Sequence, residues 1–388
     1  MNALQHLQEL GAKSELLVAG LMTGTSVDGL DIAICRMSAS LDRMPELIDG
    51  RTVPFPAALR QQLLGLKDAS VPELARADLA LGRFQATALE AVLTETAVGP
   101  LDLVGSHGQT AYHEHRVTTL QIGEPVCIAQ ALGCPVIADF RRADVVAGGS
   151  GAPLVPVFDQ LFLADPDRTV LALNLGGIAN FTVLPKGGGP PLAMDCGPGN
   201  MIVDGLVQRL SGGALAYDKG GALAANRRVD RTLLAELASH PTLQTPPPRS
   251  LGREQFGDSF VEALIDRVAP SSDAEWGELI ATATALTAEA LARACEAFVP
   301  ARPSDGARIS RILVSGGGVH NATLLGLIEM RLPGVEVAST ACVGLDPDFK
   351  EAIAFAAMAV LAVVGAPVAT GSYTGAGSKV RLGKLALP

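Results

Sequence analysis

One loop of the sequence is dense in groups that could bind phosphate. Residues 21–31 read LMTGTSVDGLD and lie between two apolar, strand-like segments. Glycine lets backbone N–H groups approach a phosphate closely, and Thr and Ser hydroxyls add donors. The carboxylates of Asp28 and Asp31 can face phosphate through a cation such as hydrated Mg²⁺. A β-hairpin with polar turn residues accounts for the same pattern, and no G-K-[ST] follows. On this stretch alone, both interpretations stay open.

Two more glycine-rich turns lie in the second half of the chain. LNLGGIANFTVL (173–184) places Gly176 and Gly177 between two apolar strands, where a hairpin is again the alternative. VSGGGVHN (314–321) ends a strand in three glycines before a helix, and this turn would let a flat group such as adenine lie against the backbone. A strand-glycine-strand loop in each half favours phosphate binding from both sides.

A carboxylate at the end of a third apolar strand could act as a base. Asp195 lies in AMDCGPGNMIVD (193–204) and is followed by Gly197 and Pro198. A turn Asp that accepts backbone N–H bonds is the structural explanation. The functional explanation is a general base held at the rim of a cleft.

Four other residues carry groups suited to ligand contacts. His107 follows a strand end, a place where ligand contacts concentrate. Arg141 and Arg142 precede a glycine-rich bend, where one of them could clamp a carboxylate or phosphate and the other could pair with a nearby Asp. Glu351 begins an Ala-rich helical segment. The helix dipole alone explains an acidic residue at this position, so a ligand role competes with that structural explanation.

Composition bounds the class of protein. The 388 residues suggest two or three domains, and a formal net charge of -10 argues against nucleic acid as the main partner. The six cysteines are scattered with no C-x-x-C pair, which predicts free thiols and a reducing, cytoplasmic location. The N-terminus lacks the features of a signal peptide. The longest apolar run, 353–369, is broken by Gly365 and Pro367 and predicts a buried helix, not a membrane span.

The order of predicted elements occurs twice. A strand, loop and strand are followed by helices and then by further strands and loops, so we expect two α/β domains, each with a mixed sheet, facing each other across a cleft. Proline-rich residues 245–250 are expected to form a surface turn. The predicted strands are 16–22, 30–37, 47–55, 101–107, 119–123, 134–140, 169–185 (two strands), 311–318 and 335–340; the predicted helices are 57–66, 71–96, 200–212, 276–299 and 321–332.

Together these motifs resemble the anhydro-N-acetylmuramic acid kinase family of the actin, hexokinase and sugar-kinase superfamily. The resemblance runs from about residue 17 into the C-terminal tail. It implies a two-domain actin/hexokinase-like (ribonuclease H-like) fold with a nucleotide cleft between the domains. The motifs that carry it are MTGTSVDGLD, GSHGQT, ADFRRADVVAGGSGAPLVP, LNLGGIANFT, DCGPGNMIVD, VSGGGVHN and KEAIAFA.

The resemblance implies ATP- and Mg²⁺-dependent phosphorylation of a 1,6-anhydro sugar, 1,6-anhydro-N-acetylmuramic acid, with hydrolytic opening of the anhydro ring in cell-wall recycling. Domain I would comprise 1–143 and 372–388, and domain II 144–371. Asp195 would be the general base. Nucleotide contacts would come from Gly24, Thr25, Ser26, Val27, Asp28, Gly29, Leu30, Asp31, Asn174, Gly176, Gly177, Gly197, Gly316, Gly317 and Gly318; sugar contacts would come from His107, Arg141, Arg142, Asn180 and Glu351.

The sequence departs from the expected patterns at two positions, and two rival functions stay open. Met22 stands where the superfamily's first loop has Asp, so Asp28 is our candidate for magnesium ligation. Cys196 stands where the family often has Thr. The rival functions are a related anhydrosugar or sugar kinase similar to levoglucosan kinase, and a non-enzymatic actin-like ATP-binding module. By analogy we expect a homodimer, with no nucleic acid or membrane partner.

Overall fold

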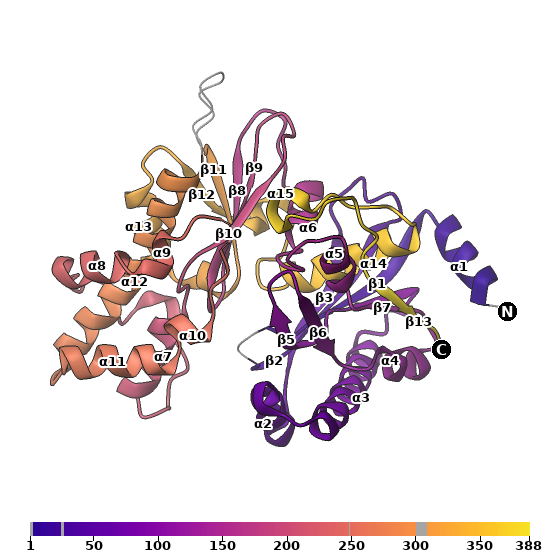
Figure 1. Ribbon diagram of the computed structural model, residues 1–388, viewed down its shortest axis with the longest axis horizontal. Coiled ribbons are helices and arrows are strands. Elements are labelled where there is room, and N and C mark those ends of the chain that lie inside the picture. Colours follow the sequence, from indigo (N-terminus) through magenta and orange to yellow (C-terminus); the bar gives the residue numbers. More distant parts are fainter. Residues whose placement is uncertain (1–2, 25–26, 248, 300–308) are drawn as a thin grey trace. The chain divides into compact units, whose positions relative to one another are not determined.

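The computed structural model describes residues 3–24, 27–247, 249–299 and 309–388. The chain divides into two compact units, each with its own sheet (Figure 1). Unit 1 comprises Met1–Phe162 and Val343–Pro388, and unit 2 comprises Leu163–Cys342. The division expected from the sequence placed residues 144–162 and 343–371 in the second domain, whereas they are part of unit 1.

Unit 1 has a mixed sheet in the strand order β13-β7-β4-β1-β2-β3. Strands β1, β2 and β3 form the expected antiparallel meander. Strands β4 and β7 run parallel to β1, and β13 forms one edge of the sheet, antiparallel to β7. A separate hairpin, β5–β6, follows β4. The strands are β1 (Glu15–Met22), β2 (Gly29–Ser38), β3 (Glu46–Pro54), β4 (Leu103–Ser106), β5 (Gln109–Glu114), β6 (Thr118–Ile122), β7 (Val136–Ala138) and β13 (Lys384–Ala386).

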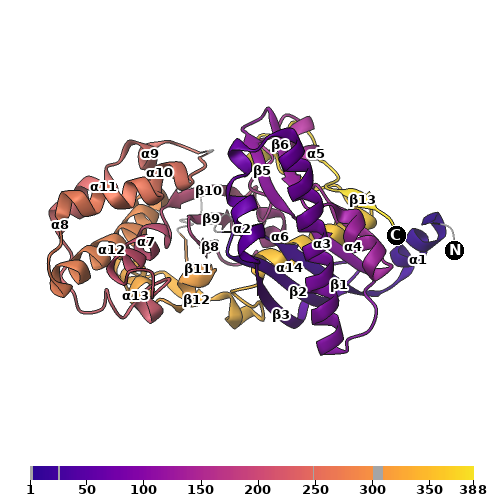
Figure 2. The same ribbon diagram turned by 90° about the horizontal axis from the view of Figure 1, so that it is seen from below.

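Helices cover both faces of the unit 1 sheet. Ala19 and Leu21 of β1 share a core with α3 and α4, which lie side by side in both views (Figure 1 and Figure 2). The intervening Gly20 faces α14, because successive residues of a strand point to opposite faces. The helices are α1 (Ala3–Ala12), α2 (Ala57–Leu64), α3 (Val71–Thr96), α4 (Pro125–Leu132), α5 (Arg142–Val146), α6 (Pro156–Phe162), α14 (Lys350–Val363) and α15 (Gly371–Thr374).

Two glycines let α14 approach this sheet closely. A Cβ on Gly20 would lie 1.8 Å from the Ala352 carbonyl oxygen, and one on Gly105 of β4 would lie 2.3 Å from the Phe355 carbonyl oxygen. The helix backbone therefore rests directly on β1 and β4. This packing explains why residues 343–371 belong to unit 1, and it brings the N-terminus of α14 to the strand ends that carry the candidate ligand contacts.

Unit 2 also has a mixed sheet, in the order β10-β9-β8-β11-β12. The first three strands are antiparallel neighbours, and β11 runs parallel to both β8 and β12. The mixed sheet expected in each half is thus confirmed. The strands are β8 (Val170–Leu175), β9 (Ala179–Leu184), β10 (Leu192–Gly197), β11 (Arg311–Ser315) and β12 (Glu336–Ser339); the helices are α7 (Met201–Leu210), α8 (Arg231–Ala238), α9 (Pro241–Gln244), α10 (Arg253–Phe256), α11 (Asp258–Val268), α12 (Asp273–Phe298) and α13 (Ala322–Arg331).

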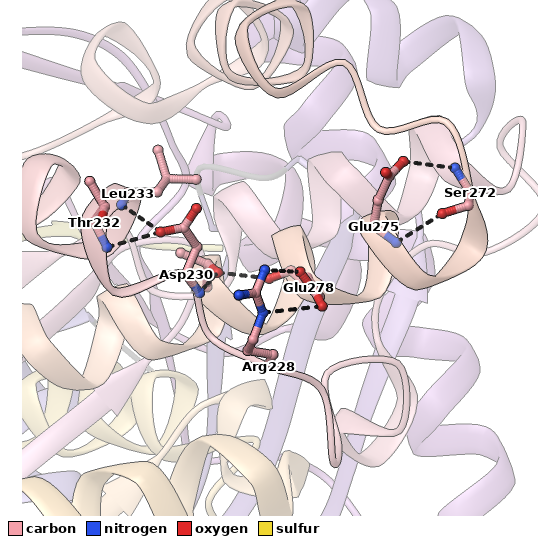
Figure 3. Close-up of polar contacts among 8 residues, drawn as sticks. Arg228, Asp230, Thr232, Leu233, Ser272, Glu275 and Glu278 are labelled. Carbon is pink, nitrogen blue, oxygen red and sulfur yellow. Dashed lines mark hydrogen bonds and ion pairs between the residues drawn. The ribbon is translucent and has the colours of Figure 1, made fainter.

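The long helix α12 organises unit 2. Its C-terminal half packs in the core under the sheet, and its N-terminal half packs among α7, α8 and α11. Ser272 and Glu275 form a capping box at its start, and Asp230 accepts two backbone N–H bonds at the start of α8 (Figure 3). The Arg228–Glu278 ion pair, at 3.1 Å, ties the segment before α8 to α12.

No helix in the described part of the chain is both long and apolar enough to cross a membrane.

Candidate active site

The loop after β1 is partly described. Thr25 and Ser26 lie outside the described residues. Val27 has a left-handed backbone (φ 54°), and its N–H donates to the Gly24 carbonyl at 3.2 Å. The buried hydroxyl of Thr23 has no hydrogen-bond partner among the described residues. Val27 is thus hydrogen-bonded to Gly24, and Thr23 places a buried hydroxyl directly after β1.

The two carboxylates after this loop have different surroundings. The Asp28 side chain is 68% exposed and pairs with Arg60 Nη2 at 3.2 Å. Asp31 instead accepts a hydrogen bond of 2.6 Å from the Thr52 hydroxyl. Burial, together with nearby Asp348, raises the pKa of Asp31, while this hydrogen bond lowers it. Gly29 and Leu30 are already part of β2, and the Leu30 side chain lies in the core, so its backbone alone could reach a ligand.

A magnesium site made by the protein alone is not evident from the donor set. Among the described residues, no three His, Cys, Asp or Glu side chains gather where they could hold a metal ion. One Asp28 oxygen already accepts from Arg60. Mg²⁺ commonly takes one or two carboxylates together with phosphate oxygens and water. Asp28 fits this mode, in which the nucleotide and water supply most ligands.

Charged groups converge at the start of α14. Lys350 Nζ donates to Asp159 Oδ1 at 2.9 Å, and both side chains are almost completely buried. Burial raises the pKa of the adjacent Glu351; Lys350 and Arg141 oppose this rise, whereas Asp31 and Asp159 add to it. Asp31, Arg141 and Glu351 come from three distant parts of the sequence, and unit 1 brings them into one electrostatic neighbourhood.

The adjacent arginines Arg141 and Arg142 are in different environments. Arg141 is half-buried and donates from Nε and Nη2 to His107 Nε2, at 3.0 and 2.9 Å. Burial lowers its pKa to about 10, and Glu351 opposes that shift. Arg142 is 42% exposed; its Nε donates to the Thr119 carbonyl at 3.2 Å and lies 3.5 Å from Asp139. Arg141 therefore faces the charged groups around α14, and Arg142 is occupied by a local network.

In unit 2, the strand register brings polar residues into one row. Asp195 of β10 pairs with Asn180 of β9, which pairs with Asn174 of β8. Asn174 in turn pairs with Ser315 of β11. Residues paired in this way lie on the same face of a sheet. The predicted site residues Asp195, Asn180 and Asn174 are thus neighbours across three strands.

The glycine turns of unit 2 pack around this row. The Gly176 and Gly177 carbonyls accept from the backbone N–H groups of Asn200 and Met201, at 2.9 and 3.1 Å. A Cβ on Gly316 would lie 2.5 Å from Asn174 Oδ1, and Gly316 has φ 80°, so glycine is required there. A Cβ on Gly317 would meet nothing within 4 Å. The GG and GGG turns therefore lie at one end of the sheet, with the open position at Gly317.

Asp195 is held by a segment distant in the sequence. Its Oδ2 accepts the Leu251 N–H at 2.7 Å, and Ser250 adds a side-chain hydrogen bond. Burial raises the pKa of Asp195 to about 6, although these hydrogen bonds and Arg249 oppose the shift. A carboxylate with a pKa near 6 is ionised at neutral pH and basic enough to accept a proton. Gly197 follows after a break in the β9–β10 register and is buried beside α12.

The role of Arg249 is not predicted by the sequence pattern. The expected surface turn at 245–250 is wrong for this residue, which is 6% exposed. Its guanidinium donates to backbone carbonyls of residues 195, 196, 243 and 245. These bonds fix β10 next to the segment that holds the Asp195 carboxylate. The three consecutive prolines before it indicate a surface turn, which is why this role was not predicted. The position of an Arg directly after this rigid segment is the sequence feature that could have indicated it.

Comparisons with known proteins identify the family of this chain. The family model described as anhydro-N-acetylmuramic acid kinase matches residues 16–387. Proteins of that name from Caldanaerobacter subterraneus subsp. tengcongensis and Salinibacter ruber are 37% and 40% identical; the alignments cover 99% and 98% of this chain and 100% and 99% of the relatives. Among solved structures, a ROK family glucokinase from Streptomyces griseus in complex with glucose and AMPPNP is 15% identical, with a TM-score of 0.40 over 88% of this chain and 99% of that chain. The chain belongs to the anhydro-N-acetylmuramic acid kinase family.

Proposed function

We propose that this protein transfers the γ-phosphoryl group of ATP to O6 of 1,6-anhydro-N-acetylmuramic acid while water opens the 1,6-anhydro bridge. The products are N-acetylmuramic acid 6-phosphate and ADP, and the reaction belongs to the recycling of cell-wall sugars. Family membership supports the reaction class. The observation that carries the proposal is Asp195, a half-buried carboxylate whose raised pKa of about 6 suits a general base.

The proposed reaction balances through one proton acceptor. Water attacks C1, the C1–O6 bond breaks, O6 attacks the γ-phosphorus, and the bond from that phosphorus to the β-phosphate oxygen breaks. Asp195 takes the proton of the water. General base catalysis of this kind contributes typically 10²- to 10⁴-fold. The Leu251 N–H keeps the carboxylate oriented throughout.

We assign the remaining groups by their charge and position. Arg141 and Glu351 would contact the sugar, because Glu351 begins α14, Arg141 lies in its electrostatic environment, and both side chains are half-buried. Glycine turns of unit 2 would contact the nucleotide, with the nucleoside against Gly317, where the backbone is open. Mg²⁺ would neutralise charge on the phosphates, with Asp28 as its protein ligand.

The cellular setting is also a proposal. All six cysteines lie within the described residues and are free thiols, which is typical of a reducing compartment such as the cytoplasm. The homodimer expected by analogy stays a prediction.

An isotope experiment tests the reaction. Turnover of the anhydro sugar with ATP in ¹⁸O-water should place one ¹⁸O at C1 of the phosphorylated product, because water opens the bridge. Since an anomeric hydroxyl exchanges with solvent, unlabelled product incubated for the same time provides the control. Phosphorylated product without label above this control would instead indicate an ordinary sugar kinase.

Two further arms distinguish the proposed enzyme from an ATP-binding module and from a kinase of plain anhydrohexoses. ADP release that does not depend on any sugar would indicate an ATP-binding module that hydrolyses ATP slowly. Faster turnover of levoglucosan than of 1,6-anhydro-N-acetylmuramic acid would move the substrate assignment to a plain anhydrohexose. We expect ADP release to require the muramic acid derivative.

A further inference from the structure

Both ring nitrogens of His107 are engaged by the protein. Nδ1 lies 2.8 Å from the Gly108 carbonyl oxygen, and Nε2 lies 3.0 and 2.9 Å from Nε and Nη2 of Arg141. A carbonyl oxygen accepts and a guanidinium donates, so the proton must be on Nδ1 and Nε2 must be the acceptor. His107 is therefore neutral, in a single tautomer.

The surroundings of the ring keep it in this state. His107 is 3% exposed, and burial together with Arg141 lowers its pKa to about 3. Its ring centroid lies 4.7 Å from that of Phe355 on α14. Its backbone N–H donates to the Leu21 carbonyl at 3.0 Å, which anchors it at the end of β1. A ring with no free nitrogen and almost no exposed surface is poorly suited to contact a sugar directly.

The contact constrains Arg141 more than a single hydrogen bond would. Two N–H groups on the same edge of the guanidinium converge on one acceptor, which sets both the position and the plane of the group. The acceptor is uncharged, so the positive charge of Arg141 is not neutralised on that edge. The other N–H groups of the guanidinium point away from His107.

One face of α14 contacts the His107 ring and also contributes to the environment of Arg141. Glu351 and Phe355 are four residues apart on α14 and lie on one face of the helix. Phe355 backs the His107 ring, and Glu351 contributes to the electrostatic environment of Arg141. A change in the His107 ring would thus alter the placement of Arg141 relative to Glu351.

We propose that His107 is a positioning residue, which holds the Arg141 guanidinium in the orientation used to bind substrate and does not itself contact the sugar. This inference rests on the proposed function, in which Arg141 contacts the sugar.

Two substitutions separate the contacts of the two ring nitrogens. His107→Gln places an amide oxygen near the position of Nε2 and retains the acceptor for Arg141. His107→Asn reaches the position of Nδ1 and can still donate to Gly108, but offers Arg141 no acceptor. Both variants remove the ring that packs on Phe355, so each is the packing control for the other, and thermal unfolding shows whether both variants stay folded.

We expect His107→Asn to lower kcat/KM for the anhydro sugar about 10- to 100-fold, as for a lost hydrogen bond to a charged group, and to leave KM for ATP unchanged. His107→Gln should stay within about 3-fold of the wild type. Adding His107→Asn to Arg141→Ala should cost less than about 3-fold further, because the two residues act as one unit. Equal losses in Asn and Gln, near wild-type rates in Asn, or additive losses in the double variant would each overturn the proposal.

A spectroscopic measurement tests the geometry independently of turnover. Histidine ¹⁵N NMR of the full-length protein at pH 7, with His107→Gln used to assign the signal, should show a protonated Nδ1 and an unprotonated Nε2. A protonated Nε2 would overturn the proposal. If no anhydro sugar is turned over, the proposed function fails, and the NMR result still decides whether His107 accepts from Arg141.

Discussion

Replacing the proposed base should stabilise the protein and at the same time abolish its activity. Burial raises the pKa of Asp195 from 3.8 to about 6, which means that folding disfavours its charged form. Between these pH values the folded state binds more protons than the unfolded state, so wild-type stability falls as pH rises. A difference of about two pKa units corresponds to about 3 kcal/mol at pH well above 6.

Asp195→Asn removes this pH-dependent cost but keeps an acceptor for the Leu251 N–H. Linkage between pKa values of 3.8 and about 6 gives roughly 2 kcal/mol at pH 5 and about 3 kcal/mol at pH 7.5. The stability of the variant relative to wild type should therefore increase by about 1 kcal/mol over this interval. Turnover should fall by 10² or more while ATP still binds.

The assay can be confined to the unit that contains Asp195. The single tryptophan of the chain, Trp276, packs against the helical core of unit 2. Its fluorescence during urea unfolding at pH 5 and pH 7.5 reports that unit. A stability difference that stays constant or shrinks as pH rises would refute the reasoning about the buried charge. Wild-type turnover in Asp195→Asn would refute its role as base.

Three further predictions concern unit 1. Gly20→Ala should destabilise unit 1 by more than about 3 kcal/mol in chemical unfolding, because a Cβ there would lie 1.8 Å from the backbone of α14. The control Gly326→Ala on α13, where a Cβ would meet nothing within 4 Å, should leave the protein equally or more stable. Equal effects of the two substitutions would contradict the close packing. Lys350→Met should lower the free energy of unfolding by about 3 to 5 kcal/mol, because it leaves buried Asp159 without this partner. Adding Asp159→Leu to the same chain should recover part of this loss. A wild-type Tm in the single variant would argue against the buried pair. Arg141→Ala should lower kcat/KM for the sugar at least tenfold more than Arg142→Ala, because Arg142 is exposed and bonded locally; the reverse order would exchange their roles.

Much of the local structure was predictable from residue patterns. The helix predicted at 276–299 is α12, Asp273–Phe298, and the strands around Gly176 and Gly177 form the predicted hairpin. The meander that begins unit 1 follows the alternation of apolar residues in its strands. These signals are local, because propensity and periodicity act over a few turns of helix or a few residues of strand.

The candidate site was predictable residue by residue, but its internal connections were not. Asp195 was recognised as a carboxylate at a strand end, whereas Arg249, Ser250 and the Leu251 N–H that surround it belong to a segment expected to lie on the surface. Asp31 belongs to the predicted phosphate loop, and the packing of unit 1 also brings it into the electrostatic environment of Glu351. Patterns of residue types do not indicate which distant side chain fills the space beside a given group.

By itself, the sequence determined the inventory of chemical groups: three glycine-rich turns, a carboxylate at a strand end, an arginine pair and an acidic residue that begins a helix. The tertiary structure decided which of these groups meet. It pairs His107 with Arg141 across 34 residues and Lys350 with Asp159 across 191, and it buries Asp195 enough to raise its pKa to about 6. The physical reason is that hydrogen bonding and desolvation depend on neighbours in space, and the packing of α14 against two glycines and of Arg249 against β10 creates those neighbours.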